Sequence, residues 1–180
     1  MKVYTLRADV NKYRGLYYKN ADDVVDFNRR FDGTSLKRNW SGQEKFAFIP
    51  RRLPKGDTPG LSTHIPVFNS KTVKVLADLL QSNGELLPIT CDEEEYLVFN
   101  VNRVIDALDE SNCEIKRFSD GGIMDIVRYS FVEEKLIGIV IFKLPQDLLG
   151  SVYVTDPFVE RVKAAKLKGF KLPLIWSSHR

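Results

Sequence analysis

Cysteine and histidine are scarce in this chain. Cys91 and Cys113 are the only cysteines among 180 residues, too few for a disulfide framework and without Cys-x-x-Cys spacing. His64 is the one interior histidine, because His179 is the next-to-last residue. A zinc site with two histidine ligands and thiol catalysis are therefore not expected. We expect both cysteines to be buried as small apolar side chains.

Long apolar runs are also absent. No run approaches the roughly 18 residues of a membrane-spanning helix, and residues 1–7 lack the apolar core of a secretory signal. Hydrophobic residues make up 43% of the chain and charged residues 28%, as in globular rather than disordered proteins. We therefore expect a soluble, cytoplasmic protein with no membrane partner.

Charge is distributed unevenly along the chain. The net charge is +3, with +6 in residues 1–60, −9 in residues 61–160 and +6 in residues 161–180. A uniformly basic nucleic-acid binder would not contain an acidic centre of this length, so direct nucleic-acid binding is not expected. The acidic centre suits docking of a basic partner. The alternative is that folding interleaves the segments into a surface of mixed charge.

The spacing of apolar residues predicts an α+β fold, mainly an antiparallel sheet with three or four short helices. Helices are predicted between the N-cap Asn20 and Gly33, from the cap Ser70 to Asn83, over 103–108, and between the cap Asp156 and Gly169. Strands are predicted over 2–8, 16–18, 86–89, 96–101, 127–131, 136–142, 152–154 and 170–176.

Proline and glycine concentrate between residues 50 and 66. The run 54–60 predicts a loop, and we place a boundary there between an N-terminal α+β portion, residues 1–60, and an α+β domain, residues 61–180. A connection of this length favours two lobes over one compact unit.

Candidate catalytic groups are few. His64 lies in a loop-like setting, and an enzyme that used it would place it within hydrogen-bond reach of a carboxylate. No Walker or dinucleotide glycine pattern is present, so no cofactor is expected. Consecutive carboxylates at 92–95 splay apart on a turn, which does not suit a metal site. The sequence therefore favours a protein that is not an enzyme.

Six short segments, taken in order, resemble a known family. They are Pro-Val-Phe-Asn-Ser at 66–70, Gly-Glu-Leu-Leu-Pro-Ile at 84–89, Tyr-Leu-Val-Phe-Asn-Val at 96–101, Val-Ile-Asp-Ala-Leu-Asp at 104–109, Val-Tyr-Val-Thr-Asp-Pro-Phe at 152–158 and Leu-Lys-Gly-Phe at 167–170. Their order over residues 64–176 resembles a DUF1629-type family of bacterial proteins, the Imm11-like immunity proteins of polymorphic toxin systems. The matched residues are fold determinants and carry over no active site.

The resemblance implies a non-enzymatic protein that binds a cognate toxin, encoded by the adjacent gene, inside the producing cell. Toxins that act on nucleic acids present basic grooves, so carboxylates on the inhibitor can mimic phosphate. The candidate partner contacts are Asp92, Glu93, Glu94, Glu95, Asp109, Glu110 and Glu114. Two alternatives remain open: an enzyme that uses His64, and a nucleic-acid or regulatory module whose basic ends, 1–60 and 161–180, fold onto one face.

Overall fold

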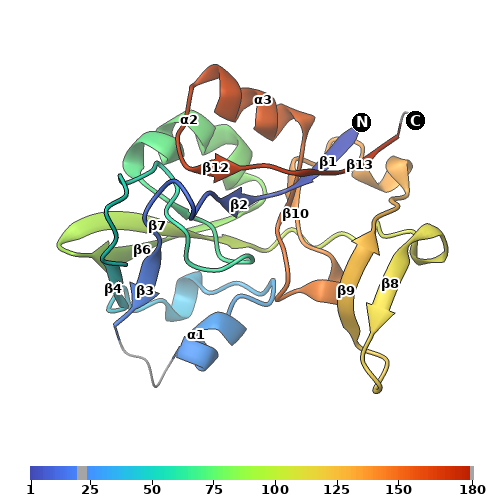
Figure 1. The fold of residues 1–180 in the computed structure, drawn as a ribbon, viewed down its shortest axis with the longest axis horizontal. Coiled ribbons are helices and arrows are strands. Elements are labelled where there is room, and N and C mark those ends of the chain that lie inside the picture. Colours follow the sequence, from blue (N-terminus) through green and yellow to red (C-terminus); the bar gives the residue numbers. More distant parts are fainter. Residues whose placement is uncertain (20–23, 179–180) are drawn as a thin grey trace.

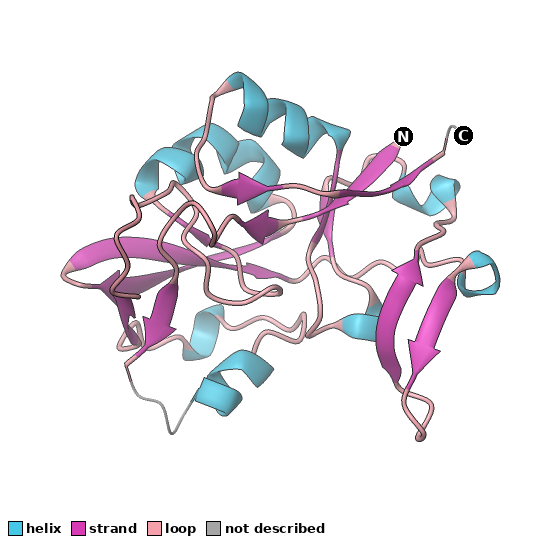
Figure 2. Ribbon diagram, viewed as in Figure 1, coloured by secondary structure: helices cyan, strands magenta, loops and turns pink. Residues whose placement is uncertain are grey.

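Strands from both ends of the chain pair with each other and with strands from its middle (Figures 1 and 2). The computed structural model describes residues 1–19 and 24–178. Within them lie three α-helices: α1 (Val24–Arg29), α2 (Ser70–Gln81) and α3 (Asp156–Ala164). Short 3-10 turns are η2 (Lys37–Asn39), η3 (Glu110–Asn112), η4 (Glu133–Leu136) and η5 (Pro145–Asp147). The predicted cap Asn20, Asp22 and Asp23 beside it, and His179 lie outside the described residues.

The strands of the described residues form four sheets. One has the order β10 (Ile141–Phe142), β11 (Tyr153–Thr155), β1 (Lys2–Thr5), β13 (Leu174–Ser177). The largest has the order β3 (Leu16–Tyr18), β4 (Lys45–Phe48), β6 (Gly84–Cys91), β7 (Glu94–Val101), β5 (Val67–Phe68). Two-stranded sheets pair β2 (Arg7–Ala8) with β12 (Phe170–Lys171), and β8 (Glu114–Arg117) with β9 (Ile123–Arg128).

Antiparallel pairing dominates, because β4 with β6 is the one parallel pair among these strands. The predicted α+β class, mainly antiparallel with few short helices, is confirmed. Strands of residues 1–60 share sheets with strands of residues 61–180: β1 lies between β11 and β13, and β4 lies beside β6. The boundary near residue 60 stays a prediction, although this pairing argues against two independent units.

Helix α2 forms as its apolar spacing predicts. Leu76 and Leu80, one turn apart, are fully buried in the core that α2 shares with α3; burial of such a side chain contributes about 1.5–3 kcal/mol. The cap is Asn69 and not the predicted Ser70, because the Asn69 side chain accepts a hydrogen bond from the Thr72 amide at 2.9 Å. Asn69 has the extended backbone that suits a cap, whereas Ser70 is already helical.

Helix α3 starts one residue earlier than predicted, at Asp156. Its carboxylate does not cap the helix but accepts hydrogen bonds from the Lys2 amide and the Tyr4 hydroxyl of β1, at 3.0 and 3.2 Å. Thr155 occupies the cap position without a side-chain capping bond. Its hydroxyl donates to the Ile139 carbonyl at 2.7 Å instead, so contacts between distant segments replace the local cap.

Two predicted elements are wrong. Residues 103–108 form no helix; the Ile105 amide donates to the Lys143 carbonyl at 2.9 Å, and Leu108 forms a bridge with Phe131. The predicted strand over 136–142 shortens to β10, because η4 includes Leu136 and a turn follows at 137–138. In both places, hydrogen bonds to distant segments override weak local propensity.

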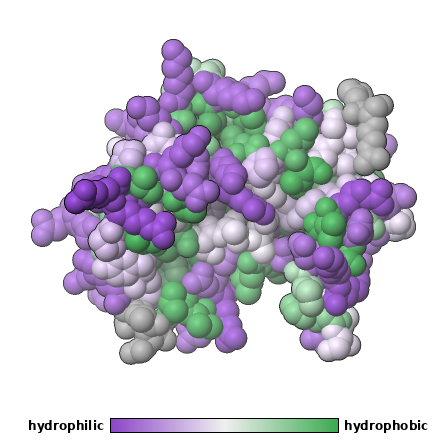
Figure 3. Space-filling model, in the orientation of Figure 1, coloured by the Kyte–Doolittle hydropathy of each residue, from purple (hydrophilic) through white to green (hydrophobic). Residues whose placement is uncertain are grey.

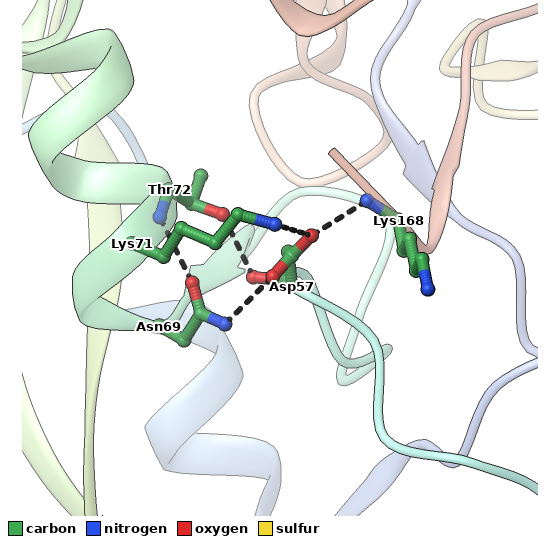
Figure 4. Close-up of polar contacts among 5 residues, drawn as sticks. All are labelled: Asp57, Asn69, Lys71, Thr72 and Lys168. Atoms are coloured by element: carbon green, nitrogen blue, oxygen red, sulfur yellow. Dashed lines mark hydrogen bonds and ion pairs between the residues drawn. The ribbon is translucent and has the colours of Figure 1, made fainter. Parts of the chain in front are cut away.

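The Pro/Gly-rich stretch is a loop, as predicted, and buried Asp57 anchors it (Figure 4). The Asp57 carboxylate accepts hydrogen bonds from the Asn69 side-chain amide at 3.0 Å, the Lys71 ammonium at 3.1 Å and the Lys168 backbone amide at 2.7 Å. The Asp57 carbonyl accepts the Thr72 hydroxyl at 3.1 Å. One carboxylate thus joins the loop to the start of α2 and to the segment after α3.

Candidate partner-binding surface

The first group of predicted partner contacts forms the turn between β6 and β7. Asp92 and Glu93 have positive φ angles of 45° and 69°, as a two-residue hairpin turn requires. Asp92 accepts a hydrogen bond from the Phe48 amide at 3.0 Å, which lowers the pKa of this carboxyl, and it lies 3.5 Å from the Lys19 ammonium. Glu94 forms an ion pair with Lys55.

The side chains of Glu93 and Glu95 are exposed and make no hydrogen bond or ion pair with another described residue. The turn therefore presents two unengaged carboxylates beside two that intramolecular lysines already neutralise.

The second group lies just before and within β8. Asp109 accepts hydrogen bonds from Asn112 and Ser111, each at 2.7 Å, and these bonds lower its pKa. Glu110 pairs with Arg117 at 2.7 Å. Glu114 is exposed on β8, opposite Arg128 of β9. The three predicted residues of this group therefore share one local surface.

The two groups do not meet. In Figure 1 the β6–β7 turn lies at the left end of the molecule, and η3 with β8 lies at the right end. The structure thus divides the seven predicted contacts into two surfaces at opposite ends of the longest axis. The linear acidic segment does not fold into one acidic face.

The β8–β9 hairpin exposes apolar side chains that sequence reasoning did not single out. Phe118, Met124 and Val127 are 52%, 53% and 47% exposed. Ile126 of the same hairpin is buried in the core with Phe131, so the hairpin is anchored to the core while these three side chains reach solvent. Figure 3 shows hydrophobic patches among hydrophilic side chains at this end.

A cavity of about 420 Å³ opens beside this hairpin. It is lined by three separate segments, and its lining includes Ser111, Asn112, Arg128, Tyr129, Ser130 and Trp176. Trp176 packs edge-on to Phe131 at 5.6 Å, and the Tyr129 hydroxyl lies 3.3 Å from that of Tyr153. Residues up to 67 positions apart, from Ser111 to Ser178, supply the walls, so no motif in the sequence could have indicated the cavity.

His64 is only 6% exposed and makes two hydrogen bonds, neither to a carboxylate. Its Nε2 lies 3.1 Å from the Asn28 carbonyl, and its Nδ1 lies 2.9 Å from the Ser62 hydroxyl. A carbonyl only accepts, so Nε2 carries the proton and Nδ1 accepts from Ser62. Burial lowers the pKa of His64. The arrangement required by the enzyme alternative is not formed.

The other buried reactive groups are also enclosed. Cys91 is buried as predicted, and burial raises its pKa to about 12, whereas Cys113 is only half-buried. Lys143 is fully buried, its ammonium donates to the Phe31 carbonyl, and burial lowers its pKa to about 8. Among the described residues no group of His, Cys, Asp or Glu is placed to hold a metal ion. No helix of that part is long and apolar enough to cross a membrane.

The basic ends of the chain lie side by side. Arg7 of β2 is opposite Lys171 of β12, and the backbone amide of Asp9 donates to the Gly169 carbonyl at 2.7 Å. Like charges directly opposite each other in a strand pair are unfavourable. The nucleic-acid alternative requires the basic ends to lie together in this way. The N-terminal segment also carries acidic residues, Asp9 and Asp57, which offset part of its positive charge.

Comparison with known proteins gives one family. Residues 90–175 match the model of an immunity protein family (Imm11). The matched segment runs from the end of β6 into β13 and contains η3, the β8–β9 hairpin and most of the cavity wall. The predicted resemblance to Imm11-like immunity proteins is confirmed over these residues, and it suggests an immunity protein. No curated protein matches the chain.

Proposed function

We propose, from the family match of residues 90–175, that this protein binds and neutralises a cognate antibacterial toxin in the cytoplasm. Inhibition is stoichiometric and needs no catalytic group in this chain. The match is the observation that carries the proposal. The toxin is the product of the adjacent gene, which keeps a lethal enzyme and its inhibitor together.

The distribution of exposed and enclosed groups supports a binding role. His64, Cys91 and Lys143 are buried, and each is held inside the fold without access to a substrate. Exposed apolar side chains lie instead on the β8–β9 hairpin, and exposed charged side chains lie on hairpins at both ends of the molecule. Partner recognition draws on such surface groups.

We propose that the partner contacts one of the two surfaces on which the seven acidic residues lie. Glu93, Glu95 and Glu114 are exposed, whereas Asp92, Glu94, Asp109 and Glu110 are engaged within the chain, as described above. Because one unblocked toxin molecule can damage a cell, we expect a dissociation constant near 10⁻⁹ M or below, about −12 kcal/mol.

Co-expression with the product of the adjacent gene tests the proposal. We expect restored growth, a one-to-one complex by light scattering, and nanomolar affinity by calorimetry. Toxin activity should fall linearly with added protein until the two are equimolar. Full inhibition at a small fraction of one equivalent would indicate turnover and favour the enzyme alternative. Absence of both rescue and binding would overturn the proposal.

Nucleic-acid binding is the second candidate, favoured by the juxtaposition of Arg7 and Lys171. It predicts that the protein alone binds duplex or single-stranded DNA or RNA with an affinity that falls steeply with salt. The double variant Arg7→Gln/Lys171→Gln should then weaken binding and flatten the salt dependence. Fluorescence anisotropy at two salt concentrations measures both, and unchanged binding by the variant would remove this candidate.

A further inference from the structure

The β8–β9 hairpin exposes apolar side chains to solvent in an ordered conformation. Phe118 follows β8 in a closed loop, where its amide donates to the Gly122 carbonyl at 2.8 Å and its carbonyl accepts the Gly121 amide at 3.0 Å. The Arg117 guanidinium donates to the Gly121 carbonyl at 3.0 Å. These bonds order the loop, so the exposure of Phe118 is not a consequence of fraying. Large apolar side chains exposed on one ordered hairpin are the kind of surface that marks an interaction site.

The cavity beside the hairpin has the composition of a binding hot spot. Arg128, Tyr129 and Trp176 line it, and arginine, tyrosine and tryptophan are the residue types enriched where single contacts dominate binding. Serine and asparagine side chains in the same wall supply donors and acceptors for polar groups of a partner. A side chain projecting from a partner would therefore find both apolar area and hydrogen bonds.

The charge around the hairpin specifies the chemistry of that partner. Residues 106–128 contain six acidic and three basic residues, in a chain whose net charge is positive. Arg117 is paired with Glu110. Exposed Glu114 and Asp125 lie on the two strands opposite Arg128 and Lys116, so the excess of negative charge falls on Asp106, Asp109 and Asp120. At the β6–β7 turn, Lys19 and Lys55 offset Asp92 and Glu94 and leave Glu93 and Glu95 unengaged, but no large apolar side chain of this turn is exposed.

We propose that the toxin docks on the hairpin end, meaning β8, β9 and the adjacent cavity, and not on the β6–β7 turn. The partner surface presents an apolar patch that packs on Phe118 and Met124, a polar side chain that enters the cavity beside Tyr129, and basic side chains that face the net negative charge of the hairpin. The inference rests on the proposed function and selects one of its two acidic surfaces. Of the predicted contacts, Asp109, Glu110 and Glu114 belong to this surface.

Two matched pairs of variants test the choice of surface. Phe118→Ala/Met124→Ala removes exposed apolar contacts at the hairpin end, and Tyr17→Ala, 47% exposed on β3, is the control. Glu114→Gln/Asp125→Asn removes two carboxylates there, and Glu93→Gln/Glu95→Gln removes two at the other end. All four substitution sets lie on exposed positions, and urea denaturation of each variant checks that folding is unchanged.

Calorimetry and stopped-flow binding to the adjacent-gene toxin measure the effects. We expect the apolar hairpin variant to bind about 30-fold more weakly, mainly through faster dissociation. The neutralised hairpin variant should associate about 5- to 10-fold more slowly, with a flatter salt dependence. Both controls should stay within about 2-fold of the unaltered protein, which is the range of independent surface changes.

The outcomes separate the two claims. Binding by the unaltered protein with equal binding by both hairpin variants would overturn the docking site and leave the immunity function standing. Loss of binding in Glu93→Gln/Glu95→Gln alone would place the interface at the opposite end. No binding by the unaltered protein would overturn the proposed function and the docking site together.

Discussion

Asp57 and His64 lie seven residues apart in the Pro/Gly-rich loop, and both are buried with hydrogen-bond partners. The sequence predicted the loop, but it did not indicate a hydrogen-bond partner for either residue. Asp57 draws its donors from Asn69, Lys71 and Lys168. Since Lys168 is 111 positions away, the anchoring role depends on folding of both halves.

Asp57→Asn should lower the free energy of unfolding by about 1–3 kcal/mol at pH 7. Burial raises the pKa of Asp57, but the hydrogen bonds from Lys168, Asn69 and Lys71 outweigh it and hold the pKa below its ordinary value. The folded state therefore gains stability above the unfolded-state pKa of about 3.9, and loses it as pH falls through the lower folded pKa. Urea denaturation from pH 7 to pH 2 measures both effects.

The difference in the free energy of unfolding between the wild type and Asp57→Asn should decrease as the solution is acidified. Glu95→Gln, at an exposed carboxylate, is the control and should follow the wild-type curve. A constant difference at every pH would contradict the role assigned to the ionised Asp57 carboxylate.

His64→Gln should leave toxin neutralisation intact and change the pH dependence of stability. Burial lowers the pKa of His64 in the folded state, so the unfolded chain binds the proton first, below about pH 6.5. Stability of the wild type should fall over this range, and the variant should lack that slope. Thermal unfolding at pH 7.5 and 5.5, with growth rescue, tests both points. Loss of protection by a folded variant would revive the enzyme alternative.

At the scale of elements, the β6–β7 hairpin was predicted well because its signals are local. Two short, nearly continuous apolar runs, 86–89 and 96–101, with an acidic turn between them indicate paired strands in any fold. Helix α2 was predicted for the same reason, since its apolar positions repeat with the helical period. The helix predicted over 103–108 is absent, and the strand predicted over 136–142 is shorter than expected. Both segments lie where single β-bridges to distant segments determine the backbone conformation.

Glu93→Gly should raise the free energy of unfolding by about 0.5–1 kcal/mol. Glu93 has a φ of 69°, which is unfavourable for a residue with a Cβ atom and ordinary for glycine. Because the turn lies away from the proposed docking surface, toxin affinity should not change. Urea denaturation and calorimetry measure the two quantities. A less stable variant would show that the glutamate side chain stabilises the turn.

At the scale of the whole molecule, β1 joins the two ends of the chain in one sheet by strand pairing. It lies between β11 and β13, so residues 2–5 bond on both sides with residues after 150. The same arrangement brings the two basic ends together and leaves the acidic middle at the two far ends. The predicted boundary near residue 60 therefore has a direct test in truncation.

A fragment of residues 61–180 should not fold cooperatively. Without β1, strands β11 and β13 lose their shared partner, and without β4 the β6–β7 hairpin loses a neighbour. The aromatic near-UV circular dichroism signal should vanish, and urea denaturation should lack a sigmoidal transition. Addition of a separate 1–60 fragment should restore both in part. A cooperative transition of the isolated fragment would support the two-domain prediction.

The sequence by itself determined the α+β class, helices α2 and α3, the β6–β7 hairpin and the resemblance to immunity proteins. Each of these depends on spacing within a short segment, which the chain carries before it folds. Only the tertiary structure decided how the acidic residues divide between two surfaces and which residues surround the cavity. The cavity wall joins Ser111, Arg128 and Trp176, and their proximity follows from strand pairing across the whole chain.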